Sequence, residues 1–307
     1  MVWLTPRIFS LSEKQLWGRK RHCPMPLPGL RLKRERMPAA NDSMIDRVAR
    51  ILEAFSAGER ALSPTELGRR AGLPTPTAHR IVGDLVRSGL LERDTTGKIR
   101  VGIRLWELVA RSAGTYSLRE IALPFMDDLQ GVVRQHTQLS VLDKSDVLYL
   151  EVLSSSHSSA PNVTKPGTRL PVLACASGIV LAAFSPPEIQ EELFQAKVTA
   201  FTPHTITDRS LLRKEIAKAH VAGYALASGW IHAYSSGLAV PILLEDGTAV
   251  GALSVTTPRG EAEKLTLLSG LRTTARVISR SLRVGNRMAD PGLNLLRQQI
   301  RRATEVG

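Results

Sequence analysis

The chain has 307 residues, 43% of them hydrophobic and 22% charged, which are values of globular proteins and not of disordered or low-complexity chains. The length is about that of two domains, and no apolar run approaches the roughly 20 residues that a membrane-spanning helix needs. Two cysteines are too few for a disulfide scaffold and favour a reducing, cytoplasmic location, while a formal net charge of +13 favours an anionic partner such as nucleic acid.

Residues 1–40 form a basic leader with nine Lys or Arg and two acidic residues, so +7 of the +13 lies there. Its prolines and its lack of a sustained helical or strand period predict disorder. Arg7 interrupts the one apolar stretch that could serve as a signal peptide. A transit peptide and a flexible arm that touches DNA phosphates are alternatives. We favour a natural start at Met37 or Met44, with the leader an artefact of start-codon choice.

The first strong pattern lies in residues 43–72 and predicts two helices. An apolar stripe at helical spacing, which we expect to be buried, consists of Met44, Ile45, Val48, Ile51, Leu52 and Phe55. Ser43 can cap this helix. A second, short helix is expected from Pro64 to Gly72, because Ser63, Pro64 and Glu66 form a capping box and Gly72 suits a left-handed C-terminal position.

A third helix follows almost at once, with Thr75 expected as N-cap, Pro76 in its first position and an end at Gly89. Its apolar stripe consists of Ala78, Ile81, Val82, Leu85 and Val86. Two helices of about two and three turns joined by residues 72–75 predict a helix-turn-helix.

The polar face of this third helix is typical of a DNA recognition helix. It consists of Thr77, Arg80, Gly83, Asp84 and Arg87. We expect the first turns to enter the major groove, with Thr75 and Thr77 near phosphates or base edges and Arg80 reaching guanine or phosphate. Asp84 would oppose this unless it pairs with Arg80 or Arg87. A solvated helix face is the alternative, and the capped helix before it and the hairpin after it favour DNA.

Residues 90–102 alternate around a polar turn that contains glycine, which predicts a β-hairpin, the wing of a winged helix-turn-helix. Lys98 and Arg100 lie on one face of their strand and could clamp a phosphate or enter the minor groove. The full set of expected DNA contacts is Thr75, Thr77, His79, Arg80, Arg87, Lys98 and Arg100.

The second half mixes helical and strand periods, which indicates an α+β domain. Strands are expected at 139–143, 147–151, 238–243 and 249–256, the last two joined by an Asp-Gly turn. Helices are expected at 103–111, 118–133, 178–184, 188–194, 208–221 and 262–283, with Leu211, Leu212 and Ile216 facing inward. Residues 154–167 read as a loop or irregular edge.

These segments resemble the IclR family of bacterial transcriptional regulators from about Ser43 to Arg283. The similar blocks are LSPTELGRRAGLPTPTAHRIVGDLVRSGLLERD, GKIRVGIRLWEL, GTRLPVLACASGIVLAAF and GYALASGWIHAYSSGLAVPILLEDGTAVGALSVTTP. The recognition-helix core of the family is matched by Pro74, Thr77 and Arg80, whereas Ile99 stands where the wing usually has an aromatic residue. The resemblance implies a winged helix-turn-helix joined by a linker helix to a GAF-like effector-binding domain. It also implies a homodimer, or a dimer of dimers, on a palindromic operator.

The resemblance further implies a small organic acid as effector. Its contact positions fall on Ala176, Ser177, Ala227, Gly237, Ser254 and Thr256, with Trp230 at the edge of the pocket. Ser and Thr that merely satisfy local backbone groups are the alternative for the strand positions. The chain departs from the family pattern at four places. Leu173 and Ile179 replace the usual histidine and lysine, Gly229-Trp230 replaces an acidic pair, and Gly237 stands where relatives often have cysteine. A less polar pocket should prefer a larger or partly apolar acid over one of the size of glyoxylate.

No motif supports catalysis, so no catalytic residue, metal or cofactor is expected. The seven histidines stand singly, Cys175 lacks a nucleophile elbow, and neither a P-loop nor a dinucleotide fingerprint follows a predicted strand. An enzyme or sensor without specific DNA binding is the alternative function.

The expected division of the chain is a leader (1–40), DNA-binding domain (41–102), linker helix (103–116), effector domain (117–288) and tail (289–307).

Overall fold

The computed structural model describes residues 42–55, 61–112, 114–196, 198–261 and 265–284. The predicted basic leader and C-terminal tail lie outside these residues. Within the described ranges, no helix combines the length and the apolar character needed to cross a bilayer.

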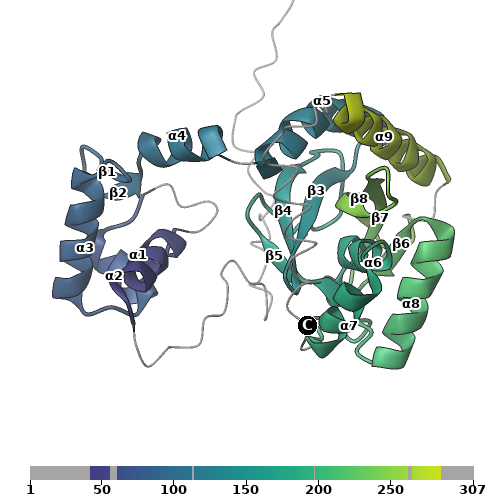
Figure 1. The fold of residues 1–307 in the computed structure, drawn as a ribbon, viewed down its shortest axis with the longest axis horizontal. Coiled ribbons are helices and arrows are strands. Elements are labelled where there is room, and N and C mark those ends of the chain that lie inside the picture. Colours follow the sequence, from purple (N-terminus) through teal and green to yellow (C-terminus); the bar gives the residue numbers. More distant parts are fainter. Residues whose placement is uncertain (1–41, 56–60, 113, 197, 262–264, 285–307) are drawn as a thin grey trace, which may run out of the picture.

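The N-terminal part packs three helices and a two-stranded hairpin around one core (Figure 1). Its elements are α1 (Met44–Glu53), α2 (Pro64–Ala71), α3 (Thr75–Arg87), β1 (Leu91–Arg93) and β2 (Ile99–Val101). The antiparallel hairpin pairs Leu91 with Val101 and Arg93 with Ile99. Ile99 is fully buried and exchanges both backbone hydrogen bonds with Leu62, at 2.9 and 2.7 Å, which ties the hairpin to the segment before α2. The predicted winged helix-turn-helix is confirmed.

Side-chain caps fix where the first two helices begin. The hydroxyls of Ser43 and Ser63 accept the backbone N–H of Asp46 and of Glu66, each at 3.1 Å. Gly72 ends α2 in the left-handed region at φ 63°. The Glu66 carboxylate accepts hydrogen bonds from arginines on the next turn of α2 instead of closing the second half of the capping box. Those arginines lower the pKa of Glu66 to about 2.

Two details of the predicted N-terminal helices were wrong. Met44 and Ile45 are 42% and 74% exposed, because the core of this domain is reached only by the later turns of α1, where Ile51 is fully buried. Thr75 is the first helical residue of α3 and not its cap. The Pro74 carbonyl already accepts the N–H of Ala78 at 2.9 Å, so the helix begins one residue earlier than expected.

The C-terminal part is built on a six-stranded antiparallel sheet with the strand order β5-β4-β3-β8-β7-β6. The strands are β3 (His136–Asp143), β4 (Asp146–Leu153), β5 (Arg169–Pro171), β6 (Ala225–Ser228), β7 (Ser235–Leu243) and β8 (Ala249–Pro258). Its helices are α5 (Gly114–Val133), α6 (Ala176–Ala183), α7 (Pro187–Gln195), α8 (Arg209–Ala222) and α9 (Leu265–Val284), with a 3-10 turn, η2, at Val172–Ala174. Helix α4 (Ile103–Ser112) follows the hairpin of the N-terminal part and precedes α5 (Figure 1). The predicted α+β class is confirmed.

Helices cover both faces of this sheet (Figure 1). Helices α5 and α9 pack on one face, where apolar side chains such as Leu253 and Leu271 are fully buried. Helices α6, α7 and α8 pack on the other face around a second apolar cluster. Leu212 and Ile216 of α8 face this cluster as expected, but Leu211 is 46% exposed, because neighbouring positions on a helix point about 100° apart. The strands β5 and β6 were not predicted.

Candidate functional site

The polar face of α3 is open to solvent. Thr75, His79, Arg80 and Arg87 are exposed and Thr77 is half-buried. The opposite face carries Ala78, Ile81, Val82 and Leu85 into the core, all buried. Packing therefore fixes the helix while its polar face stays available to a partner.

Asp84 pairs with both arginines of this face. One of its carboxylate oxygens lies 3.8 Å from Nη1 of Arg80, and the other accepts a hydrogen bond from Nη2 of Arg87. The Arg80 and Arg87 side chains nevertheless remain 58% and 76% exposed. The carboxylate holds the two guanidinium groups on one side of α3 and neutralises part of their charge.

In the wing, the two basic residues differ. Arg100 lies opposite Glu92 in the hairpin register and donates from Nε to its carboxylate at 3.1 Å. Glu92 also accepts the backbone N–H of Ile103 at 3.1 Å. The Ile103 amide, and then Arg100, lower the pKa of Glu92. Lys98 is exposed in the turn, where its backbone N–H bonds Asp94. Lys98 has no ion pair among the described residues, unlike Arg100.

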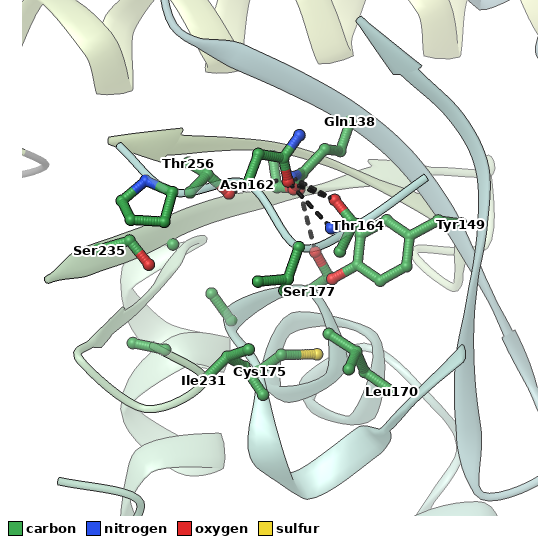
Figure 2. Close-up of a pocket in the computed structure, with 16 residues that line it drawn as sticks. Gln138, Tyr149, Asn162, Thr164, Leu170, Cys175, Ser177, Ile231, Ser235 and Thr256 are labelled. Atoms are coloured by element: carbon green, nitrogen blue, oxygen red, sulfur yellow. Dashed lines mark hydrogen bonds between the residues drawn. The ribbon is translucent and has the colours of Figure 1, made fainter. Parts of the chain in front are cut away.

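A pocket opens on the α6 side of the sheet and encloses about 490 Å³, including its open mouth (Figure 2). Six of the seven predicted effector positions line it: Ala176, Ser177, Ala227, Gly237, Ser254 and Thr256. They come from the start of α6 and from β6, β7 and β8. Residues 80 positions apart in the sequence are thus brought to one cavity, and no charged side chain lines it.

A chain of hydrogen bonds joins the polar groups of this pocket. Ser177 donates to the Ser254 hydroxyl at 3.1 Å, and Ser254 donates to the Gln138 amide oxygen at 3.1 Å. The Gln138 amide nitrogen donates to the hydroxyls of Thr164 and Thr256, both at 2.9 Å. Gln138 is only 3% exposed, so a buried side chain of β3 holds the polar groups of this wall together. The polar wall is pre-formed and electrically neutral.

The opposite side of the pocket is mainly apolar. Figure 2 shows Leu170, Ile231 and Cys175 across the cavity from the hydrogen-bonded polar groups. Burial raises the pKa of the Cys175 thiol to about 11, and burial also raises the pKa of Tyr149 well above its ordinary value. Both groups are therefore neutral near pH 7. The described residues also contain no cluster of three metal-ligating side chains.

The loop 154–168 forms one side of the pocket and is held by His136 at the start of β3. Nε2 of His136 lies 3.0 Å from the Ala160 carbonyl oxygen, and Nδ1 accepts the Ser155 N–H at 3.1 Å. This arrangement requires a neutral ring with its proton on Nε2. Burial lowers the pKa of His136, which is 7% exposed, and so favours that neutral form.

Trp230 is the predicted effector residue that the structure does not place in the pocket. Gly229 has a left-handed φ of 76°, and after this turn Trp230 is buried in the apolar cluster under α6 while Ile231 faces the cavity. The sequence reading also missed polar lining residues: Gln138, Tyr149, Asn162, Thr164 and Ser235. Alternation on β3 and β4 could have suggested the first two, but no local signal marks the loop residues.

Family models match both parts of the chain. Residues 110–280 match the model of the bacterial transcriptional regulator IclR C-terminal domain, more than half of the chain. Residues 44–95 match the IclR helix-turn-helix domain. The chain belongs to the IclR family. It is a transcriptional regulator of this family with a helix-turn-helix DNA-binding domain.

Curated relatives of this IclR-family regulator match over nearly their whole length. The HTH-type transcriptional regulator XynR of Escherichia coli is 28% identical over 78% of this chain and 96% of its own. The glycerol operon regulatory protein of Streptomyces coelicolor is 28% identical over 80% of this chain and 99% of its own. These homologues are named as regulators and not as enzymes.

Solved structures agree with the fold. An IclR homolog from Microbacterium hydrocarbonoxydans, crystallised with 4-hydroxybenzoate, is 42% identical over 79% of this chain and 100% of its own, with a TM-score of 0.73. A regulator from Rhodococcus sp. RHA1 is 26% identical over 79% of this chain and 98% of its own, with a TM-score of 0.66.

Proposed function

We propose that this regulator binds operator DNA through α3 and the wing and changes its DNA affinity when a small, partly apolar organic acid fills the C-terminal pocket. The observation that carries the proposal is the neutral pocket, in which one wall is polar and hydrogen-bonded and the other is apolar. Such a ligand shifts the regulator only if it binds its DNA-competent and DNA-incompetent arrangements with different affinities.

The DNA-binding half of the proposal assigns the contacts to α3 and the wing. Arg80 reads guanine or phosphate, while Thr75, Thr77 and His79 contact phosphates or base edges. Arg87 and the wing residues Lys98 and Arg100 hold the DNA backbone. Two copies in a homodimer place two recognition helices on a palindromic site, with half-sites about one helical turn or more apart.

The effector half of the proposal follows from the pocket chemistry. A carboxylate in a cavity without cations must be held by hydrogen-bond donors. The Thr256 hydroxyl accepts from Gln138 and keeps its own proton to donate. The Ser177 and Ser254 hydroxyls can donate to a ligand when they exchange their present bonds for it. Leu170 and Ile231 suit an aromatic or aliphatic body. The 42% identical structure contains 4-hydroxybenzoate, a molecule with this combination of groups, so 4-hydroxybenzoate is the first compound to test.

The proposed function of each segment follows the domain boundaries expected from the sequence. Residues 41–102 bind DNA, residues 103–116 link the two parts, and residues 117–288 form a GAF-like effector domain. We propose a homodimer as the working unit, with a dimer of dimers as its larger form.

The effector proposal is tested by thermal shift of the full chain with a panel of benzoates and aliphatic acids. A raised Tm with 4-hydroxybenzoate or a close analogue is expected, and the shift should vanish in the double variant Ser254→Ala, Thr256→Val. The matched control is Ser269→Ala, on the exposed face of α9, which should keep the full shift. An equal shift in the double variant, or no shift with any acid, contradicts the proposed pocket.

The alternative function, an enzyme without specific DNA binding, makes the opposite prediction. Turnover of a small molecule would survive deletion of residues 1–112, whereas the regulator loses its sequence-specific activity with the same deletion. The neutral Cys175 thiol gives no support to a nucleophilic mechanism.

A further inference from the structure

A second concave surface lies away from the effector pocket, between α8 and α9 at one edge of the sheet. Both helices border this edge in Figure 1. The groove is lined by the end of α8 (residues 220–222) with Gly223 after it, by residues 240, 241 and 243 of β7, by Phe184 and by one face of α9. It shares no lining residue with the effector pocket.

One wall of this groove is a row of arginines. Arg272, Arg276, Arg280 and Arg283 follow one another on α9 and all line the groove. At about 1.5 Å of rise per residue, the row extends over about 16 Å. Helix α9 contains no acidic residue, and no acidic side chain lines the groove.

Among the described residues, the first of these arginines has partners and the other three have no ion pair. Nη2 of Arg272 donates to the Ala222 carbonyl oxygen at 2.5 Å, at the end of α8, and its guanidinium lies 5.5 Å from the centre of the Tyr224 ring. Arg276, Arg280 and Arg283 have no ion-pair partner among the described residues and are exposed. Three unneutralised cations on one groove wall favour a multivalent anion.

The floor of the groove is apolar. It is formed by Phe184, Val240, Pro241 and Leu243, next to Ala275 of α9. The imidazole of His220 lies 5.0 Å from the Phe184 ring and hydrogen-bonds the Ala183 carbonyl oxygen through Nδ1 at 2.7 Å. An apolar floor beside a cationic wall suits a ligand that has a ring system at one end and several negative charges at the other.

The sheet edge in this groove is closed to an added strand. β6 pairs with β7 only up to Ala239, so residues 240–243 have no neighbouring strand on that side. Pro241 has no N–H to donate, and the Leu243 N–H already donates to the Ser279 hydroxyl at 3.0 Å. A second copy of the same surface would also bring arginines against arginines. Neither strand addition nor a symmetric self-contact fits.

We infer that the α8–α9 groove is a second ligand site, for a small molecule with two or more phosphate groups and an aromatic ring, such as a nucleoside diphosphate. The guanidinium groups of Arg276, Arg280 and Arg283, which have no ion pair within the described part of the chain, bind the phosphates, because guanidinium and phosphate oxygens form paired, charge-assisted hydrogen bonds. The ring lies on the floor around Phe184 and Pro241. Binding there joins α8 to α9 and so bridges the two helical layers of the domain.

The test is calorimetric titration of the full chain with ADP, tripolyphosphate and adenosine at low salt. ADP and tripolyphosphate should both bind and adenosine should not bind measurably, because the phosphates supply most of the affinity. The double variant Arg276→Gln, Arg280→Gln should lose ADP affinity by about tenfold or more, as expected for the loss of two charge-assisted contacts. The control Arg209→Gln, Lys214→Gln removes the same charge from exposed positions on α8 and should keep wild-type affinity within about twofold.

Several results would overturn the inference. One is wild-type protein that binds neither ADP nor tripolyphosphate, and another is an equal loss of ADP affinity in the groove variant and the α8 control. A poly-glutamate peptide that binds as tightly as ADP and depends on Arg276 and Arg280 would make an acidic protein segment the occupant. A specific loss of duplex DNA affinity in the groove variant would make DNA the occupant. The 4-hydroxybenzoate thermal shift is measured in the same variant, so failure of this site and of the effector pocket are distinguishable.

Discussion

The polar face of α3 and the C-terminal pocket differ in charge and in exposure to solvent. On α3, charged and exposed side chains lie on a helix that is fixed by the core beneath it, and Asp84 partly neutralises them. In the pocket, neutral side chains are buried, and a hydrogen-bond chain through Gln138 positions them. An extended polyanion can be bound by exposed cations that stay hydrated until contact. A single carboxylate needs donors that are already in place, because buried polar groups without partners are costly.

The largest effect is expected from a change that breaks the pocket alone. In Gly178→Ala, the new Cβ would lie 1.8 Å from the Val172 carbonyl oxygen, so α6 must move away from η2. We expect a loss of about 3 kcal/mol or more in the free energy of unfolding of this domain, together with loss of the ligand-induced Tm shift. Chemical denaturation measures the free energy of unfolding. Gly131→Ala on α5, where no atom lies within 4 Å of the new Cβ, is the control and should leave stability unchanged or slightly raised. Equal stability of the two variants would show that α6 is not held as described.

A change on α3 should raise the affinity for DNA and leave the pocket intact. Asp84→Asn removes the carboxylate that pairs with Arg80 and Arg87, and it also removes repulsion of DNA phosphates. We expect about fivefold tighter binding to any duplex at low salt, from an interaction of about 1 kcal/mol in water. Fluorescence anisotropy on two unrelated duplexes measures it. Weaker binding to both duplexes would mean that Asp84 orients the arginines more than it opposes the DNA.

The hydrogen bonds of His136 to Ser155 and Ala160 predict that the pocket depends on pH. Protonation would turn Nδ1 from an acceptor into a donor that faces the Ser155 N–H. Because the folded-state pKa is lowered, the unfolded chain takes up the proton first, so stability is complete above about pH 6.5 and falls as the pH drops below it. Effector affinity should fall only at the lower pH at which the folded ring itself takes up the proton. Titrations of effector affinity from about pH 5 to 8 measure this.

The variant His136→Asn keeps an acceptor for the Ser155 N–H but does not titrate, so its effector affinity should vary less with pH. His136→Gln keeps a donor for the Ala160 carbonyl and isolates the other bond. A wild-type pH profile shared by both variants would assign the dependence to another group.

The smallest effect is expected in the wing. Glu92→Gln frees Arg100 from its ion pair, so duplex affinity should rise by at most about twofold, since exposed pairs contribute little. Lys98→Gln should lower duplex affinity more than Arg100→Gln does, because Lys98 has no ion pair to break. The reverse order, measured at one salt concentration, would show that Arg100 leaves Glu92 when DNA binds.

Local chemistry made much of the N-terminal domain predictable. Ser63, Pro64 and Gly72 mark the ends of α2 within a residue, because caps and left-handed glycines act over a single turn. Met44 and Ile45 were misplaced because periodicity gives the apolar face of a helix but not how far along the helix the core extends. Thr75 was misplaced because the sequence does not show whether Pro74 or Thr75 is the residue just before the first turn of α3.

The pocket could be predicted only where the family resemblance supplied its positions. Gln138 and Thr256 are separated by 118 residues and meet because β3 lies beside β8, a pairing that no local pattern reveals. Trp230 and Ile231 show that the sequence also left open which of two adjacent residues faces the cavity. The left-handed turn at Gly229 decides which of them faces the cavity, and both are apolar in the sequence.

The central claim is that α3 recognises the operator sequence and that an acid bound in the pocket changes the affinity for that sequence. The most direct measurement is anisotropy of the full chain on a duplex selected from random sequence by the protein itself, for wild type and Arg80→Ala, with a scrambled duplex beside it. The account predicts that Arg80→Ala lowers affinity for the selected duplex by roughly tenfold or more and removes most of the preference over the scrambled one. An unchanged preference in Arg80→Ala would contradict it.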